Sequence, residues 1–300
     1  ACGLADPNAG WGMTQAAPEL VQWMLKLGGK FNMSGDDDVD LRNFGGQKKK
    51  RTAFAQSDTG KQIMTAMIDA VRRKEASGMV ERFSHHSFLT LRLCGNICCG
   101  CVIRDEYSQE TVELPGNAVI VATGGMHGLF GNTTGSLSNT GEVTAELFRL
   151  GVPLANGEMI QYHPTTVKCG GKRMLISEAA RGEGGRLFAM KDGKQWYFME
   201  EKYPELGNLM PRDITAREIW KVSHESEVFL DMTEISEEII SNKLSGLADD
   251  CMTYLHKDIR KEPVSVLPGI HYFMGGILVD EQHRTPIQNL YAAGECCAQY

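Results

Sequence analysis

Two short stretches of the sequence bring together residue types that handle protons. Residues 177–185 contain Glu178 and Arg181, which stand three positions apart. If this stretch is helical, the carboxylate and the guanidinium share one face, because side chains three apart are neighbours on a helix. A second arginine, Arg212, directly follows Pro211, which favours the first turn of a helix. Taken alone, each stretch also fits a surface ion pair or a helix cap.

Two histidines stand in settings that suit a binding site. His163 precedes the rigid Pro164, and the hydroxyl of Thr165 follows directly. His271 lies a few residues before the paired glycines Gly275-Gly276. Glycine leaves room for a close approach of the backbone. Each histidine also fits a satisfied side chain of the hydrophobic core.

Small residues follow two apolar runs that have the composition of buried strands. The run 117–122 leads from Ala122 into Thr123-Gly124-Gly125, where small residues let the backbone approach a nucleotide cofactor. The run 290–292 leads into Ala293-Gly294-Glu295, where the acid can accept hydrogen bonds from sugar hydroxyls. The dinucleotide fingerprint Gly-x-Gly-x-x-Gly is absent from the sequence. Ordinary strand-to-loop turns therefore remain the alternative at both places.

Four of the nine cysteines lie close together in the sequence, at Cys94, Cys98, Cys99 and Cys101. Their spacing is not a standard one for zinc or for an iron–sulfur cluster. We therefore expect small, largely buried side chains here and no metal site. On a strand, Cys99 and Cys101 face one side and Cys98 faces the other. An odd number of cysteines without a secretory signal indicates a reduced, cytoplasmic protein.

Hydrophobic periodicity predicts a mixture of helices and strands that would position these residues. Such a mixture indicates α/β or α+β layers. The predicted helices cover 18–31 with Gly28-Gly29 as the stop, a segment capped by Ser57-Asp58-Thr59, 142–150, 211–222, and a long amphipathic helix from Glu234 to Leu255; the predicted strands cover 88–93, 97–104 in a hairpin about Gly95-Asn96, 117–122, 228–230, 277–279 and 290–292.

The composition is that of an ordinary globular protein. The 300 residues suggest about two domains. The formal net charge of 31 − 38 = −7 argues against a nucleic-acid-binding protein, whose footprint would be basic. The longest apolar runs are far shorter than a membrane span. The 33 glycines are more than average, which is typical of chains with tight turns or ligand loops.

Together and in this order, the motifs closely resemble the flavoprotein subunit of fumarate reductase and succinate dehydrogenase. The resemblance runs from about Phe44 to the end of the chain. L-aspartate oxidase shares most of these blocks and is the nearest alternative. The blocks that match are Phe44-Gly45-Gly46, 51–55, Thr59-Gly60, 122–125, 161–165, 178–185, Pro211-Arg212-Asp213, 271–276 and Ala293-Gly294-Glu295.

The resemblance implies an α/β fold in which an FAD-binding domain of two or three layers is interrupted by an α+β capping domain. In this chain the first part of the FAD-binding domain would be residues 1–156. The capping domain would be residues 157–267, and residues 268–300 would return to the FAD-binding domain. The active site of the family lies between the two domains.

The resemblance also implies a reaction, in which a hydride passes between flavin N5 and one alkene carbon of fumarate. An arginine delivers the proton to the other carbon, and by motif match this arginine is Arg212. Glu178 and Arg181 match the family's proton relay. Because the pKa of arginine exceeds about 12, a proton donor of this kind needs immediate refilling, which a Glu–Arg chain leading to solvent would provide.

The remaining site residues follow from the same motif match. His163, Thr165 and His271 match the groups that bind the substrate carboxylates. Ala122, Thr123, Gly124, Gly125 and Glu295 match the blocks that bind FAD. The resemblance further implies a small dicarboxylate substrate and, in membrane-linked members, an iron–sulfur subunit as partner at the cytoplasmic face of the membrane.

The sequence departs from the family pattern at several places. Thr166 stands where the family commonly has glycine, and Thr140-Gly141-Glu142-Val143 stands where it has Thr-Gly-Asp-Gly. The N-terminal glycine-rich pyrophosphate loop, the histidine that holds covalent flavin in many members, and the later Gly-Ala-Asn-Arg block are missing. We therefore expect a fragment of a longer flavoprotein, with an incomplete FAD-binding domain; an inactive truncated product is the further alternative.

We predict that the 300-residue chain binds FAD weakly or not at all, because the expected pyrophosphate loop is missing. The measurement is the absorbance of the purified chain after incubation with FAD and removal of free flavin. A flavin band near one FAD per chain would contradict this expectation.

Overall fold

Residues 5–35, 38–47, 49–56 and 58–298 are described by the computed structural model. The chain divides into two compact units, the first made of residues 1–16, 78–161 and 270–300 and the second of residues 17–77 and 162–269. Ser57, named above as part of a helix cap, lies outside the described residues. The expected division into an FAD-binding domain and a cap at 157–267 stays a prediction.

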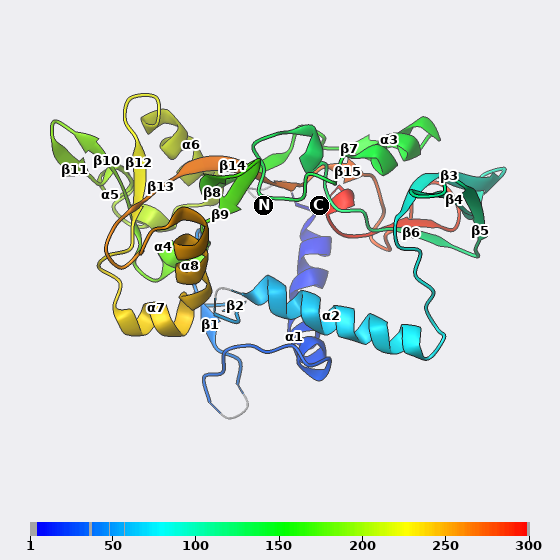
Figure 1. Ribbon diagram of the computed structural model, residues 1–300, viewed down its shortest axis with the longest axis horizontal. Coiled ribbons are helices and arrows are strands. Elements are labelled where there is room, and N and C mark those ends of the chain that lie inside the picture. The colour runs from blue at the N-terminus through cyan, green and yellow to red at the C-terminus, as the bar shows by residue number, and fades with distance from the viewer. Residues whose placement is uncertain (1–4, 36–37, 48, 57, 299–300) are drawn as a thin grey trace. The chain divides into compact units, whose positions relative to one another are not determined.

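The first unit contains a three-stranded antiparallel sheet and a parallel pair of strands. In the sheet, the predicted hairpin about Gly95-Asn96 is confirmed, and Gly95 takes the positive φ of +65° that such a tight turn requires. The strands and helices of this unit are β3 (His86–Cys94), β4 (Ile97–Asp105), β5 (Thr111–Pro115), β6 (Val119–Val121), η1 (His127–Leu129), α3 (Glu142–Arg149), β7 (Leu154–Ala155), β15 (Gly276–Ile277), β16 (Leu290–Ala292) and η4 (Gly294–Cys296) (Figure 1).

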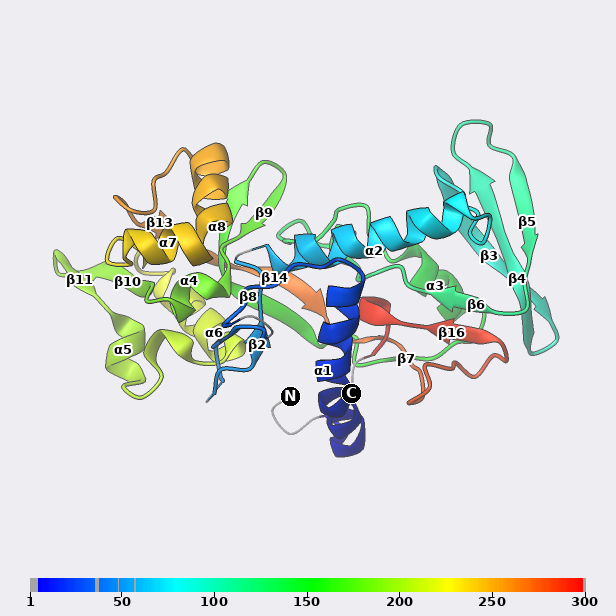
Figure 2. The ribbon, with the colours of Figure 1, turned by 90° about the horizontal axis from the view of Figure 1, so that it is seen from below.

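The parallel pair β6 and β16 brings two distant parts of the sequence side by side (Figure 2). Val119 pairs with Leu290, and Val121 pairs with Ala292. Because the strands run in the same direction, both carboxyl ends meet at one edge, where Ala293 N–H donates to the carbonyl of Val121 at 2.9 Å. A buried apolar cluster supports this pair, and it includes Leu91, Cys98, Val121, Leu147, Ile277, Leu290, Cys296 and Cys297.

The second unit contains a four-stranded antiparallel sheet in the order β11-β10-β12-β13, packed with helices over a single core. Leu187, Val228 and Leu230 of the sheet meet Ile219 and Leu247 of the helices, and all are buried. The elements are β1 (Leu41–Arg42), β2 (Thr52–Ala53), α2 (Thr59–Ala76), β9 (Lys172–Leu175), α4 (Glu178–Gly182), β10 (Arg186–Lys191), β11 (Lys194–Trp196), α5 (Phe198–Lys202), η2 (Gly207–Leu209), α6 (Arg212–Val222), β12 (Val228–Asp231), α7 (Glu237–Lys243), α8 (Ser245–Asp250), the π-helical turn η3 (Cys251–Leu255) and β13 (Val264–Ser265).

Three further elements include residues of both units. They are α1 (Pro7–Lys26), β8 (Ile160–Cys169) and β14 (Leu267–Phe273). The helix expected over 18–31 begins earlier than predicted, at Pro7, and it contains Pro18. The missed signal is Asp6-Pro7, since Asp6 Oδ1 accepts from Asn8 N–H at 2.7 Å and proline suits the first helical position. The predicted stop is confirmed, because Gly28 takes a φ of +99° and its N–H closes the last turn onto Leu25.

The single long helix expected from Glu234 is wrong. The segment is broken into α7, α8 and η3, because Leu244 leaves the helical region with φ −128° and ψ 13°. The break turns Leu244, Leu247 and Cys251 into the core of the second unit. Alternation along the cysteine-rich strand is confirmed, since Cys98 is buried whereas Cys99 and Cys101 are half-buried.

Two other kinds of feature are absent from the described residues. No helix among them is both long enough and apolar enough to cross a membrane. Within the same part of the chain, no group of three or more His, Cys, Asp or Glu side chains is placed to hold a metal ion.

The core of the second unit predicts a contrast between two leucines. Leu230→Ala should lower the free energy of unfolding by roughly 2–5 kcal/mol, because the side chain is fully buried and its removal leaves a cavity. Leu206→Ala, at a position that is 39% exposed, should change it by less than about 0.5 kcal/mol. Urea titrations of both variants measure the difference. An equal loss of unfolding free energy in the two variants would contradict the assignment of Leu230 to the core.

Candidate functional site

Glu178, Arg181 and Arg212 form one connected ionic cluster in the second unit. Arg181 Nη2 donates to Glu178 Oε1 at 2.9 Å, and Arg212 Nε donates to Glu178 Oε2 at 2.9 Å. Each carboxylate oxygen therefore serves one guanidinium. The Glu178 side chain is 3% exposed and that of Arg181 is fully buried, whereas the Arg212 side chain is 29% exposed. Arg212 is thus the member of the cluster that solvent or a ligand can reach.

Short helices place these three side chains. Ser177 caps α4, with its Oγ accepting from Ala179 N–H at 3.2 Å, so that Glu178 and Arg181 lie on one face as the spacing predicted. Pro211 ends an extended segment, and Arg212 is the first residue of α6. Because the first turns of α4 and α6 are fixed in this way, both guanidinium groups lie against the Glu178 carboxylate.

The segment before β2 closes over the carboxylate. A Cβ built on Gly45 would stand 2.3 Å from Glu178 Oε1 and 3.1 Å from the carbonyl oxygen of Met210. Only glycine leaves room for the chain to pass this close to the acid. The Phe44-Gly45-Gly46 motif was noted in the sequence only because it resembles a family block. Its contact with Glu178 gives a physical reason for a glycine at position 45.

Burial lowers the pKa of Arg181 below its ordinary value, and the neighbouring Glu178 carboxylate opposes this effect. Arg181 Nη1 donates to the backbone carbonyl of Asn208 at 2.6 Å. The expected chain to solvent does not continue at this end, because the Arg181 side chain is covered by protein. Asn208 could not be predicted from the sequence, because the contact uses its backbone carbonyl, which every residue type has.

His163 and Thr165 lie together on β8, and both are fully buried. His163 Nδ1 is 3.2 Å from the backbone nitrogen of Thr165 and 3.1 Å from its carbonyl oxygen. If Nδ1 accepts from the amide, Nε2 carries the ring hydrogen and can donate. Thr165 Oγ1 donates to the carbonyl of Ile176 at 2.9 Å. In this conformation its hydroxyl hydrogen therefore cannot be donated to a ligand.

Thr166, the position where the family commonly has glycine, anchors a neighbouring strand. Its Oγ1 donates to the carbonyl of Leu267 at 2.7 Å and accepts from Arg173 Nε. A Cβ on Gly269 would stand 2.8 Å from Thr166 Oγ1. Glycine at 269 therefore makes the room that the larger residue at 166 requires.

His271 belongs to the first unit and is oriented by a residue that the sequence analysis missed. Its Nδ1 lies 2.8 Å from Thr134 Oγ1. The same loop supplies Thr133, whose Oγ1 donates to the carbonyl of Ile270 at 3.2 Å and lies 2.7 Å from Nδ1 of the buried His127. The two neighbouring threonines thus fix one histidine each.

The edge formed by β6 and β16 has the features of a cofactor-binding edge. Ala122 and Thr123 are exposed directly after β6. Gly124 and Gly294 take positive φ values of +74° and +80°, and a Cβ on Gly294 would meet no atom within 4 Å. Loops at the carboxyl ends of parallel strands are the usual ligand sites of such folds. The exposed residues Ala122, Thr123 and Gly294 fit an extended cofactor such as FAD, whereas a Cβ on Gly124 would stand 2.7 Å from Asn139 Nδ2.

Glu295 and Gly125 are used inside the first unit. Glu295 Oε1 accepts from Phe273 N–H at 2.9 Å and from His127 Nε2 at 3.0 Å. A Cβ on Gly125 would stand 2.6 Å from the same oxygen. Because Oε1 is occupied by the protein, only the second carboxylate oxygen is left for a sugar hydroxyl.

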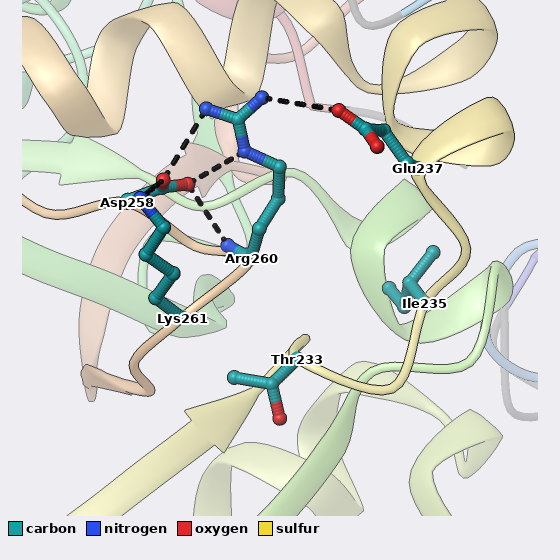
Figure 3. A pocket seen from close by; sticks show the side chains of 6 residues that line it. All are labelled: Thr233, Ile235, Glu237, Asp258, Arg260 and Lys261. Atoms are coloured by element: carbon teal, nitrogen blue, oxygen red, sulfur yellow. Dashed lines mark hydrogen bonds and ion pairs between the residues drawn. The ribbon is translucent and has the colours of Figure 1, made fainter.

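A shallow pocket elsewhere in the second unit has no comparable chemistry. It is lined by Thr233, Ile235, Glu237, Asp258, Arg260 and Lys261, and Figure 3 shows the charged side chains turned toward one another. Arg260 Nε lies 2.7 Å from Asp258 Oδ1, and the bonds from Arg260 lower the pKa of Asp258 to about 2. The charges satisfy each other, so the pocket offers no unbalanced group to a ligand.

A family model for the FAD binding domain matches residues 1–300. The chain belongs to this family of FAD-binding proteins. The expected flavoprotein character and the FAD cofactor are thereby confirmed. The predicted mixed α/β fold is confirmed at the level of a flavin-binding fold, since the match extends over both compact units.

The relatives and solved structures of this FAD-binding chain agree with the resemblance read from its motifs. It is 40% identical over 293 residues to the succinate dehydrogenase flavoprotein subunit of Bacillus subtilis, covering 95% of this chain and 50% of that protein. It is 32% identical over 303 residues to L-aspartate oxidase of Nostoc, covering 98% and 50%. A solved flavoprotein chain of Escherichia coli quinol fumarate reductase superposes with a TM-score of 0.86 at 28% identity, covering 95% and 51%. The chain spans about half the length of the curated relatives it matches.

The buried cluster predicts a large stability effect at one carboxylate. Glu178→Gln should lower the free energy of unfolding by about 3 kcal/mol, because Arg181 is left buried without its counter-charge. Glu205→Gln is the matched control at an exposed position and should be nearly neutral. Urea unfolding monitored by fluorescence compares the two variants. A loss at Glu178 no larger than that at Glu205 would contradict the description of a dry ion cluster.

Proposed function

We propose that this protein is the flavoprotein of a fumarate reductase or succinate dehydrogenase and interconverts fumarate and succinate. The observation that supports this most directly is the Arg212–Glu178–Arg181 cluster, in which one guanidinium is reachable and the rest is buried. The 40% identity to a succinate dehydrogenase flavoprotein subunit points the same way.

In this proposal Arg212 is the proton donor for fumarate reduction and the acceptor for succinate oxidation. Its Nε is held by Glu178 Oε2 at 2.9 Å, which fixes the plane of the guanidinium while part of the side chain stays exposed. A planar cation at this place also stabilises negative charge that develops on the substrate. Lysine would supply the charge without the flat, two-pronged geometry.

Glu178 and Arg181 restore the proton that Arg212 releases. A proton that leaves Arg212 can be replaced across the 2.9 Å bond from Glu178, and Glu178 in turn faces Arg181. Burial lowers the pKa of Arg181, which makes its proton easier to release than that of an arginine in water. In this relay Arg181 passes a proton to Glu178, which passes one to Arg212, and the proposal requires a movement that connects the buried Arg181 to solvent before the next turnover.

His163, Thr165 and His271 are proposed to bind the substrate carboxylates. His163 and His271 can each donate from a ring nitrogen, and Thr134 restrains His271 through Nδ1. Thr165 can donate only after its hydroxyl hydrogen turns from the carbonyl of Ile176. We therefore expect the two histidines to contribute more than the threonine to substrate binding.

FAD is proposed to lie against the loops after β6 and β16, held by Ala122, Thr123, Gly124, Gly125 and Glu295. When bound, FAD supplies the two-electron hydride chemistry that no side chain of the protein can perform. The exposed residues Ala122, Thr123 and Gly294 can contact it directly, and Glu295 offers its second carboxylate oxygen. Gly124 and Gly125 shape the loop, since Gly125 packs against Glu295. The capping domain at 157–267 is part of the same proposal.

L-aspartate oxidase activity is the second candidate, because the chain is also 32% identical to an enzyme of that name. A reduced dye with fumarate and oxygen uptake with L-aspartate separate the two activities. We favour the first, since Phe44-Gly45-Gly46 and the Gln161-Tyr162-His163 motif resemble the fumarate and succinate enzymes more closely.

The partners in this proposal are a small dicarboxylate and an iron–sulfur subunit. The name of the Bacillus subtilis relative describes it as a subunit, which supports an assembly with other chains. A cytoplasmic location, with peripheral attachment to the membrane through such partners, belongs to the same proposal.

Replacing Arg212 tests the proposed mechanism in a complete version of this protein, loaded with FAD. Arg212→Ala should reduce the rate of fumarate reduction at least about 100-fold, because proton donation and charge stabilisation are both lost. Flavin absorbance should stay unchanged, whereas the unfolding midpoint should fall, because Glu178 Oε2 loses its partner in a buried position. Arg217→Ala, an exposed arginine on the same helix, is the matched control and should retain full activity. Normal turnover in Arg212→Ala would remove this residue from the mechanism.

A further inference from the structure

Two adjacent thiols lie buried directly behind the edge formed by β6 and β16. Cys296 Sγ and Cys297 Sγ are 3.9 Å apart, and the two residues are 3% and 1% exposed. Neither the proposed reaction nor the motif Ala293-Gly294-Glu295 uses either thiol. The pair therefore needs an explanation of its own.

The backbone of this pair is fixed on both sides. Cys297 N–H donates to the carbonyl of Gly294 at 3.1 Å, and Ala298 N–H donates to the carbonyl of Ile277 at 2.9 Å. A Cβ on Gly276 would stand 2.3 Å from the carbonyl oxygen of Cys296, so β15 packs directly onto the peptide between the cysteines. Closing a disulfide between these adjacent residues therefore requires side-chain rotation together with a distortion of the peptide that joins them.

The two thiols differ in chemical character. A hydrogen bond from Cys297 lowers the pKa of Cys296 to about 6, although burial opposes it, and the backbone of Thr123 and Ala293 contributes further. The same coupling raises the pKa of Cys297. A lowered pKa favours the thiolate, which is the nucleophilic form of cysteine. By contrast, burial raises the pKa of Cys251 to about 12, as in an inert cysteine.

We propose that Cys296 and Cys297 form a modification site for hydroperoxides, which convert the two thiols into a vicinal disulfide. The Cys296 thiolate attacks one peroxide oxygen, the O–O bond breaks, and a sulfenic acid forms as hydroxide leaves and takes up a proton. The Cys297 sulfur then attacks the Cys296 sulfur, and the sulfenic oxygen leaves as water. Two thiols lose two electrons, and hydrogen peroxide is reduced to two waters.

Oxidation changes the loop that precedes the pair. In the thiol form, Cys296 Sγ donates toward the carbonyls of Val121 at 3.3 Å and Ala293 at 3.2 Å, which stand at the carboxyl ends of β6 and β16. A disulfide has no S–H hydrogen, and the sulfurs must close from 3.9 Å to about 2.05 Å. The Cys296 sulfur therefore leaves its place between the two carbonyls, so oxidation alters the edge proposed for the cofactor. This inference concerns the thiols and does not rest on the proposed reaction.

Peptide mapping of the whole chain tests the proposal. The native protein is treated with hydrogen peroxide, quenched with an alkylating reagent in denaturant, and digested with trypsin. The peptide 285–300 contains Cys296 and Cys297 and no other cysteine, so a disulfide within it makes the peptide lighter by two hydrogens. We expect this product to form first and to disappear after treatment with a reductant.

Two other peptides serve as internal controls. The peptide 93–104 holds the exposed Cys94 with three further cysteines, and the peptide 244–257 holds the buried Cys251 alone. Both should remain alkylated while 285–300 loses its thiols. Oxidation of 93–104 with both thiols of 285–300 intact would overturn the proposal.

A cysteine variant separates the two steps. Cys297→Ser should block the disulfide and leave a sulfenic acid at Cys296 that a dimedone reagent traps. If the variant does not fold, the peptide map of the native chain still decides the question. A trapped sulfenic acid at Cys297 in Cys296→Ser, formed as fast as that at Cys296, would contradict the assignment of Cys296 as the nucleophile.

Discussion

The candidate site depends on one buried carboxylate that is shared by two arginines. Glu178 is 3% exposed, and each of its oxygens is bonded to a different guanidinium at 2.9 Å. A lone charge in such a place would be costly, and so would either arginine without the acid. Gly45, the cap at Ser177 and the helix start at Arg212 all act on this cluster. The local fold of the second unit is therefore tied to the geometry of the proposed proton relay.

The first unit depends on a different constraint, the parallel pairing of β6 with β16. This pairing brings Ala122 and Ala293 to one edge, and the buried Cys296 and Cys297 pack behind it. The chemistry available there comes from backbone and small residues, which suits a bound cofactor. Glu295 contributes by bracing the loop through Phe273 and His127 as well as by facing outward.

Much of this could be predicted from local sequence signals. The spacing of Glu178 and Arg181, the hairpin at Gly95-Asn96 and the helix after Pro211 follow from rules that act over a few residues. The break at Leu244 could not be predicted, because it is set by burial in the core and not by periodicity. The supporting roles of Thr134 and Asn208 also escaped, since they depend on contacts between residues distant in sequence.

The central proposal is that this chain belongs to an enzyme that interconverts fumarate and succinate, and one assay tests it most directly. A complete version of the protein, loaded with FAD, is given a reduced dye and fumarate without oxygen, and succinate is followed by NMR as the dye is oxidised. The account predicts one succinate for every two electrons taken from the dye. Full flavin occupancy with no succinate formed, together with oxygen uptake on L-aspartate, would contradict it.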